Sequence, residues 1–181
     1  MKELYKGSLG VWLHDKNGTS GMQSAKIQAI IRQLKNIDGK VLVFSTFTSA
    51  LDLLADTCDK YLPEFKYVQI DGGTRESERQ SSLSSFRNKK KIRGLFMTYK
   101  VGSEGLTLTE ATHVIQIEPW WNDAVPNQAV HRSWRMGQMK DVEVHNILVA
   151  DSIEDRMRSI CEGKDEMSKA ILAGSSHKLV K

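Results

Sequence analysis

The sequence has few cysteines and no long apolar run. Only two of its 181 residues are cysteines, Cys58 and Cys161, and neither has a close-spaced partner or a zinc-ligand pattern. We therefore expect reduced thiols in or near the core of an intracellular protein. No apolar stretch is long enough to span a bilayer, and the N-terminus lacks the charged-then-apolar form of a signal peptide. We accordingly expect neither a membrane protein nor a secreted one.

Two patterns of nucleotide hydrolysis are also missing. The chain contains no Gly-x-x-x-x-Gly-Lys-Ser/Thr loop to hold phosphates and no acidic magnesium-binding box after a strand. The spacing of His113, His131 and His145 does not match a metal site, so no metal ligand is predicted. Nor does any serine, histidine and aspartate arrangement support a nucleophilic triad.

What is present is the composition of a globular protein. Hydrophobic residues make up 40% of the chain and charged residues 27%. The length suffices for one well-filled core and is too short for two ordinary domains. A formal charge of +4 permits a nucleic-acid partner, although such a small excess of cationic residues also serves solubility.

Apolar runs alternate with helical patterns along the chain. Runs typical of strands buried on both faces occur at residues 40–44, 67–70, 94–97, 113–117 and 142–149. Helical patterns lie between them, the first capped by Ser24 and the second by Thr48. This alternation predicts an α/β fold with an open parallel sheet covered on both faces. Ligands of such folds bind outside the carboxyl ends of the strands, where polar loops follow at Ser45, Asp71, Thr98 and Glu118.

Residues 128–138 combine an amide with cationic side chains. Read as a helix ended by Gly137, this segment places Gln128, Arg132 and Arg135 on one face. Arginine presents a planar, permanently charged fork that binds phosphate oxygens at two points. The alternative is a solvated basic helix end, where cations favour the helix dipole.

The order of these segments resembles the second, C-terminal RecA-like lobe of helicase-superfamily-two motors of the SWI/SNF-related DNA translocase kind. The resemblance rests on motif IV at residues 24–26 and 41–45, motif IVa at residues 71–74 with Arg79, motif V at residues 100–108 and motif VI at residues 128–138. Residues 118–122 and 151–154 are most similar to the DNA-repair and transcription-termination branch.

Four positions depart from the family pattern. His131 stands where aspartate is usual, Trp134 replaces histidine, Thr107 replaces asparagine and Asp123 replaces proline. The two arginines and the loop glycines are retained. The departures therefore bear on the coupling between motifs V and VI and not on the class.

The resemblance implies an α/β, three-layer RecA-like lobe of the P-loop NTPase type, with a central mostly parallel sheet flanked by helices. It implies that this lobe spans residues 24–150. Residues 1–23 would be a flexible flank or linker, and residues 151–181 a C-terminal brace helix and tail.

The resemblance makes Arg132 and Arg135 arginine fingers, which stabilise the charge that spreads over a transferring phosphoryl group. It assigns four further residues to the nucleotide side, namely Gln128, Gly102, Glu104 and Gly105. The alternatives are a structural salt bridge for the arginines, an ordinary polar helix position for Gln128, and glycines that merely permit turns.

Contacts with the DNA backbone are implied for a second set of residues, namely Ser45, Thr46, Gly73, Thr74, Arg79, Thr98, Lys100 and Trp121. Hydroxyls, backbone amides and cations bind phosphate without reading base sequence, so the expected binding is sequence-tolerant and salt-sensitive. One residue of the Trp120–Trp121 pair is expected in the core instead.

The function implied is that of the C-terminal motor lobe of an ATP-dependent double-stranded-DNA translocase or chromatin-remodelling-type ATPase. ATP and Mg²⁺ would be held by an N-terminal RecA-like lobe, so we expect the isolated chain to be inactive. The other expected partners are double-stranded DNA and chromatin or repair proteins, in the nucleus if the organism is eukaryotic. Two alternatives stay open: a non-catalytic DNA- or protein-docking module, and an RNA helicase lobe.

Overall fold

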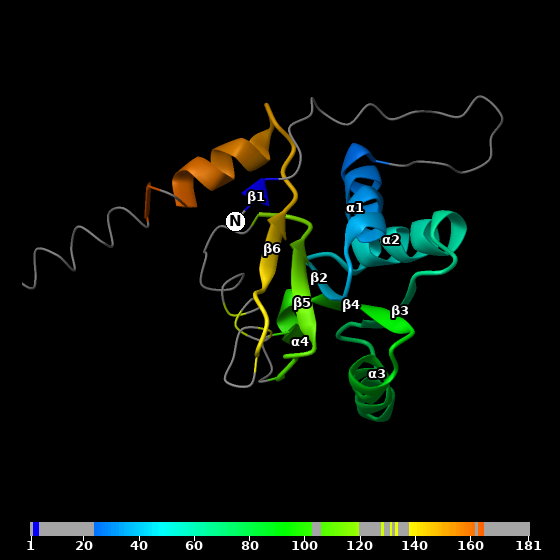
Figure 1. The fold of residues 1–181 in the computed structure, drawn as a ribbon. Helices are drawn as coiled ribbons and strands as arrows, with labels where there is room; N and C mark the ends of the chain where they lie inside the picture. The colour runs from blue at the N-terminus through cyan, green and yellow to red at the C-terminus, as the bar shows by residue number, and fades with distance from the viewer. Residues whose placement is uncertain are drawn as a thin grey trace, which may run out of the picture.

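The computed structural model describes residues 2–3, 24–102, 106–119, 128, 131, 133, 138–161 and 163–164. A six-stranded sheet with strand order β1-β6-β5-β2-β4-β3 forms its framework, and every strand pair is parallel (Figure 1). The strands are β1 (Lys2–Glu3), β2 (Lys40–Ser45), β3 (Lys66–Ile70), β4 (Ile92–Thr98), β5 (Ala111–Gln116) and β6 (Glu143–Asn146). All five strands expected from the apolar runs are therefore present.

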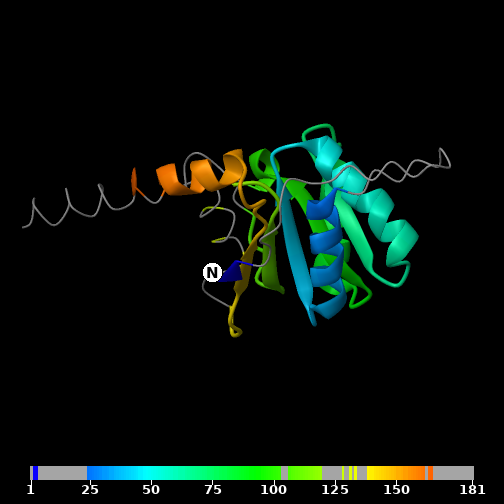
Figure 2. The same cartoon turned by 90° about the horizontal axis from the view of Figure 1, so that it is seen from above.

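Helices cover both faces of the sheet (Figures 1 and 2). The helices α1 (Ala25–Asn36) and α2 (Thr48–Tyr61) lie on one face, and α3 (Glu76–Asn88) and the short α4 (Tyr99–Gly102) lie on the other. Residues 153–161 form a further helix after β6. The three-layer arrangement agrees with the alternation of strand and helix patterns.

The residues of β2 show how the two faces are filled. Val41 and Val43 belong to the core that packs against α1 and α2, whereas Leu42 and Phe44 belong to the core formed with α3 and α4. All four side chains are fully buried. A strand buried on both faces requires apolar residues at consecutive positions, which explains the continuous apolar run in the sequence.

The starts of the first two helices test the two predicted caps. Ser24 caps α1 as predicted, because its Oγ accepts a hydrogen bond from the Ile27 N–H at 3.2 Å. The prediction for Thr48 is wrong, because Phe47 is the N-cap residue of α2 and has no side-chain cap hydrogen bond. Instead, the Oγ of Ser45 accepts a hydrogen bond from the Phe47 N–H at 3.0 Å.

The segment after β4 is helical where a glycine-bearing loop was expected. Tyr99, Val101 and Gly102 are buried residues of α4, and the Tyr99 ring stacks on Phe44 with centroids 5.5 Å apart. A Cβ added to Gly102 would lie 2.6 Å from the Cε1 atom of Phe44. The close packing of α4 on β2 therefore explains this glycine without an approaching anion.

Both cysteines are buried and free, as expected. Burial, with a smaller contribution from the neighbouring Asp59 carboxylate, raises the pKa of the Cys58 thiol to about 12. The thiol is therefore protonated and unreactive at neutral pH. Among the described residues, no helix has the length and apolar character needed to cross a bilayer.

The predicted division at residues 1–23, 24–150 and 151–181 stays a prediction, but two observations bear on its ends. Residues of β1 extend the sheet by pairing with β6, Lys2 opposite His145 and Glu3 opposite Asn146. The strand expected at residues 142–149 is shorter than the apolar run, because β6 ends at Asn146.

We expect Gly102→Ala to lower the free energy of unfolding by about 1–3 kcal/mol, because the methyl group overpacks a buried contact. Gly72→Ala is the matched control, since nothing lies within 4 Å of its added Cβ and its φ is not positive. The control should change the free energy of unfolding by less than about 1 kcal/mol. Urea unfolding measures both variants, and equal losses would contradict the packing explanation.

Candidate functional site

The polar segments noted in the sequence lie at the carboxyl ends of neighbouring strands. Ser45 ends β2, and its register partner on β4 is Thr98. Phe44 pairs with Gln116 on β5, so Glu118 follows two residues beyond that pair. The strand β3 ends opposite the same region of β4, because Ile70 pairs with Met97. These segments therefore share the edge of the sheet at which parallel α/β folds bind ligands.

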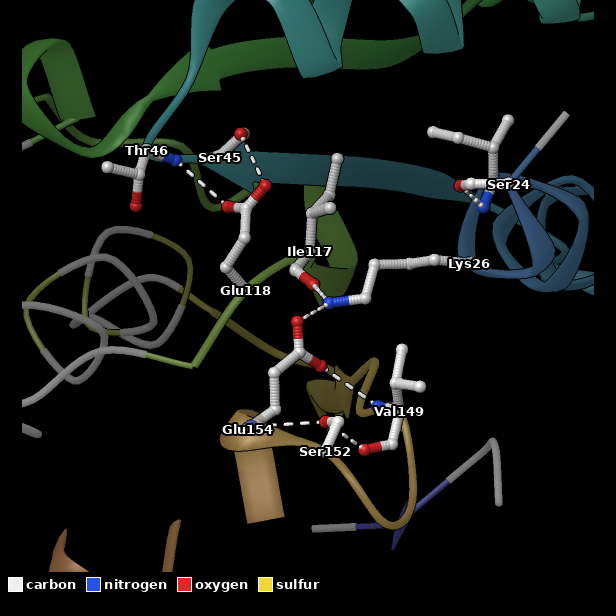
Figure 3. Close-up of polar contacts among 10 residues, drawn as sticks. Ser24, Lys26, Ser45, Thr46, Ile117, Glu118, Val149, Ser152 and Glu154 are labelled. Carbon is white, nitrogen blue, oxygen red and sulfur yellow. Dashed lines mark hydrogen bonds and ion pairs between the residues drawn. The ribbon is translucent and has the colours of Figure 1, made fainter. Parts of the chain in front are cut away.

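The carboxylate of Glu118 joins the segments that follow β2 and β5. Its Oε1 accepts a hydrogen bond from the Ser45 hydroxyl at 2.9 Å, and its Oε2 accepts one from the Thr46 N–H at 3.0 Å (Figure 3). No role was predicted for Glu118 beyond its place in a family motif. The sequence did contain a signal for this role. Glu118 directly follows an apolar strand, and the hydroxyl-rich loop after Ser45 is expected at the same edge of the sheet.

Lys26 forms a second junction beside Glu118. Its Nζ donates a hydrogen bond to the Ile117 carbonyl at 2.8 Å and is ion-paired with Glu154 (Figure 3). The side chains of Lys26 and Glu154 are only 13% and 17% exposed. Glu154 also accepts a hydrogen bond from the Val149 N–H at 2.9 Å. The start of α1, the end of β5 and the helix at residues 153–161 are thus joined at one point.

The electrostatics of Glu118 reflect its position between these groups. Burial raises the pKa of the Glu118 carboxyl above its ordinary value, and the nearby Glu154 carboxylate adds to the rise. Hydrogen bonds from Thr46 and Ser45 and the positive charge of Lys26 oppose it. The ionised carboxylate therefore depends on these donors to offset the cost of its desolvation.

Residues 71–74 form a closed turn after β3. The Thr74 N–H donates to the Asp71 carbonyl at 3.2 Å, and the Gly73 N–H donates to Asp71 Oδ1 at 2.7 Å. The Thr74 Oγ1 accepts from the Asp71 N–H at 3.0 Å. One turn into α3, Arg79 forms an ion pair with Glu76 at 3.4 Å. The backbone amide of Gly73 is therefore engaged within the turn, while its Cα faces solvent.

Burial divides the residues predicted to contact DNA. The side chains of Ser45 and Thr98 are 0% and 8% exposed, so they support the loop and the strand. The contact of these two residues with a phosphate backbone stays a prediction, and the burial of their side chains argues against it. Lys100 is exposed at the same edge, and Thr46 and Thr74 are half-buried there.

The segment at residues 128–138 departs from the expected helix. Gln128 is helical and exposed, but His131 and Ser133 lie in turns, and Ser133 is fully buried. The prediction of one continuous helix is therefore wrong at these positions, and a common helical face cannot be inferred for Gln128 and the two arginines. Outside the described residues lie Glu104, Gly105, Trp121, Arg132 and Arg135.

Gln138 anchors the end of that segment to β5. Its Nε2 donates to the Thr109 carbonyl at 2.9 Å, the Ala111 carbonyl at 3.0 Å and the Ser133 carbonyl at 3.2 Å. Its Oε1 accepts a hydrogen bond from the Lys140 N–H at 3.0 Å. The sequence carries no signal for this role. Two of the acceptors are 29 and 27 residues away along the chain, and every residue has a backbone carbonyl, so no residue type marks them.

A possible metal-ligand group lies at the other edge. Within the described ranges, the side chains close enough to share an ion are those of His113, Glu143 and His145, near the amino ends of β5 and β6. Spacing along the chain predicted no metal ligand among the histidines, and this stays a prediction, although His113 and His145 lie side by side in the structure. Two strands that are neighbours in the sheet bring together residues that are far apart in the sequence.

We expect Glu118→Ala to lower the free energy of unfolding by about 1–3 kcal/mol, because the Ser45 hydroxyl and the Thr46 N–H lose their acceptor. Glu118→Gln keeps an acceptor oxygen and should cost less. Because the pKa of Glu118 is raised on folding, its stabilising contribution is complete below the ordinary value of 4.5 and is lost as pH rises through the raised pKa.

The loss caused by Glu118→Gln should therefore be larger in urea unfolding at about pH 4 than at about pH 8. The two proteins are compared at each pH, so that changes common to other titrating groups cancel. A loss that grows toward alkaline pH would contradict the assignment of a raised pKa to Glu118.

Comparison with known proteins places this geometry in a family. The family described as "Helicase conserved C-terminal domain" matches residues 25–137. "Putative helicase 172L" of Invertebrate iridescent virus 6 is 53% identical over 135 residues, which are 75% of this chain and 22% of that protein. "DNA repair protein rad8" of Schizosaccharomyces pombe is 36% identical over 149 residues, which are 80% of this chain and 13% of that protein.

A solved structure shares the fold. The crystal structure of the C-terminal part of the Fun30 ATPase domain superposes with a TM-score of 0.73 at 33% identity, covering 82% of this chain and 48% of that one. The chain spans less than a quarter of the length of the two curated relatives. It belongs to the helicase conserved C-terminal domain family and is a C-terminal RecA-like lobe of the SWI/SNF-related kind, in the DNA-repair branch.

Proposed function

We propose that this chain is the C-terminal motor lobe of an ATP-dependent double-stranded-DNA translocase. The lobe completes an ATP site whose phosphate-binding loop and magnesium ligands belong to an N-terminal lobe, and it holds the DNA backbone during each cycle. The observation that carries the proposal is the convergence of the family's motif segments on one edge of the sheet, at the ends of β2, β3 and β4.

The nucleotide side rests on the segment at residues 128–138. Gln128 is exposed and helical, so its amide is accessible to a phosphate or its attacking water. Arg132 and Arg135 act as arginine fingers by their place in motif VI, and Glu104 and Gly105 act by their place in motif V. Gly102 is outside this set, because its close packing against Phe44 accounts for the glycine.

The DNA side rests on polar residues at the same edge, of which Lys100 is exposed and Thr46 and Thr74 are half-buried. Thr46 follows β2, Lys100 follows β4, and Gly73 and Thr74 follow β3. Arg79 lies in the first turn of α3, half-buried and ion-paired with Glu76, and Trp121 joins the set by its place in the family motif. Hydroxyl and cationic groups contact phosphates without reading bases, so the lobe binds duplex DNA in a sequence-tolerant and salt-dependent way.

Mg²⁺ belongs to the other lobe in this proposal. The Glu118 carboxylate is held by Ser45 and Thr46, so it stabilises the loop where a metal ligand would have to be open. When bound, the ion neutralises charge on the β- and γ-phosphates. The residues of this chain contribute donors to the γ-phosphate and orient the DNA. Repair or chromatin proteins are proposed partners, in the nucleus where the organism is eukaryotic.

We expect the isolated 181-residue chain to release no phosphate from ATP at a useful rate, with or without duplex DNA. The physical reason is that its sequence contains neither the phosphate-binding loop nor the acidic magnesium-binding box. A steady-state phosphate-release assay measures this. Robust turnover that a chelator abolishes would overturn the two-lobe proposal.

In a protein that contains both lobes, we expect Arg135→Ala to lower the ATP turnover rate by about a thousandfold while the affinity for duplex DNA stays unchanged. Arg156→Ala is the control, because Arg156 is an exposed arginine on the helix at residues 153–161. Equal loss of turnover and DNA binding in Arg135→Ala would argue that this arginine supports folding.

Comparing substrates in the same assay separates the remaining alternatives. Stimulation of turnover by duplex DNA but not by duplex RNA supports the translocase, whereas the reverse would identify an RNA helicase lobe. Binding of DNA without turnover in the two-lobe protein would identify a docking module.

A further inference from the structure

A cluster of three ligand-type side chains lies away from the edge assigned to ATP and DNA. His113 belongs to β5, and Glu143 and His145 belong to β6. In the strand register, His113 pairs with Glu143 and Ile115 pairs with His145. Paired residues of neighbouring strands, and residues two apart in one strand, point to the same face of a sheet. The three side chains therefore emerge from one face.

The distances within the cluster suit a small metal ion. The His113 Nδ1 and His145 Nε2 atoms are 3.3 Å apart, and His145 Nε2 lies 3.9 Å from Glu143 Oε2. One ligand atom from each residue lies within 4.8 Å of those from the other two. Two nitrogen ligands of a tetrahedral zinc ion, each at about 2.0–2.1 Å from the metal, are separated by about 3.3–3.4 Å. The two ring nitrogens already stand at this separation.

The imidazole rings face each other with centroids 5.6 Å apart and planes 18° apart. An ion would lie to one side of the line between the two nitrogens. Binding of an ion there requires each ring to turn about its Cβ–Cγ bond, so that both lone pairs point at that position. His145 is buried and Glu143 is exposed. The Glu143 carboxylate can therefore coordinate, from the solvent side, an ion that the two histidines hold.

An open cavity of about 480 Å³ gives access to the cluster from solvent. His113 and Glu143 both line it, close to the amino ends of β2, β5 and β6. Four carboxylates and two lysines line the cavity, namely Asp38, Glu110, Asp141 and Glu143 with Lys40 and Lys140. The excess of negative charge favours a cation, and Lys40 directs its Nζ away to the carbonyls of Phe86 and Arg87 at the end of α3.

We propose that His113, Glu143 and His145 bind one divalent transition-metal ion, and that Zn²⁺ is the ion the site fits best. Two imidazoles and one carboxylate are a ligand set that zinc accepts, and the cavity leaves the fourth position to water. The ion joins β5 to β6 and thereby fastens the side of the sheet that also carries β1. The site is separate from the proposed motor residues, because its three residues lie within β5 and β6 and the motor segments follow the carboxyl ends of the strands.

The test uses the full 181-residue chain without a polyhistidine tag, freed of metal by dialysis against EDTA. Titration with Zn²⁺ in a calorimeter should give one ion per chain. Co²⁺ in the same site should show the intense visible absorption of a four-coordinate complex. At zinc concentrations about a hundred times the Kd, the melting temperature should rise by about 5–10 °C.

The variants separate this site from adventitious binding. Glu143→Gln alters an exposed side chain, and it should fold normally and weaken zinc binding by at least about tenfold. His113→Asn should abolish the one-to-one binding, whereas His131→Asn, which alters an exposed histidine outside the cluster, should leave it unchanged. Melting temperatures in EDTA check the fold of each variant.

Three results would overturn the proposal. The first is the absence of stoichiometric zinc binding to the unaltered chain. The second is binding that Glu143→Gln and His113→Asn leave unchanged, which would show that the ion sits elsewhere. The third is a thiolate charge-transfer band in the cobalt spectrum, which would place the ion on a cysteine. The contact between the two rings would then be a hydrogen bond alone.

Discussion

Parallel strand pairing is the constraint on which this lobe depends. Each strand must be followed by a crossover to the opposite end of the sheet, so every carboxyl end emerges at the same edge. Residues that are distant in the sequence, such as Ser45, Thr98 and Glu118, meet there because their strands are neighbours. The same constraint collects amino ends at the opposite edge, where His113 and Glu143 face each other in register.

Several polar groups at the carboxyl edge are buried or half-buried and are satisfied by one another. A carboxylate as buried as that of Glu118 is costly unless donors surround it, and it has the Ser45 hydroxyl and the Thr46 amide. The ion pair of Lys26 with Glu154 is subject to the same cost, which the Ile117 carbonyl and the Val149 amide offset. The edge is therefore shaped by satisfied hydrogen bonds more than by net attraction between charges.

The strands and the Ser24 cap were predictable because each leaves a local pattern, an apolar run or a hydroxyl before a helix. What the sequence does not carry locally was missed. The role of Gln138 depends on backbone carbonyls of Thr109 and Ala111, and carbonyls have no residue-type signature. Thr48 has the residue type of a cap but does not act as one. The N-cap residue of α2 is Phe47, and the Phe47 N–H donates to the hydroxyl oxygen of Ser45.

The candidate site was predictable only as far as strand order determines it. The convergence of motif segments followed from the topology, whereas the burial of Ser45 and Thr98 depends on packing by the surrounding loops. The proximity of His113 and His145 likewise follows from β5 lying beside β6. The spacing of the two histidines along the chain does not reveal which strands are neighbours. Side-chain exposure and strand adjacency are tertiary properties, so neither is written in a linear motif.

The attachments of β5 at both ends have a mechanical consequence. Gln138 grips its first residue, Ala111, while Lys26 holds the carbonyl of Ile117 just beyond its last. A strand is nearly inextensible along its length, since its backbone is already close to fully stretched. A pull on the end of the 128–138 segment therefore cannot be absorbed between these two anchors. β5 therefore forms a stiff connection between the two edges of the lobe, from the Gln138 contact to the Lys26 contact.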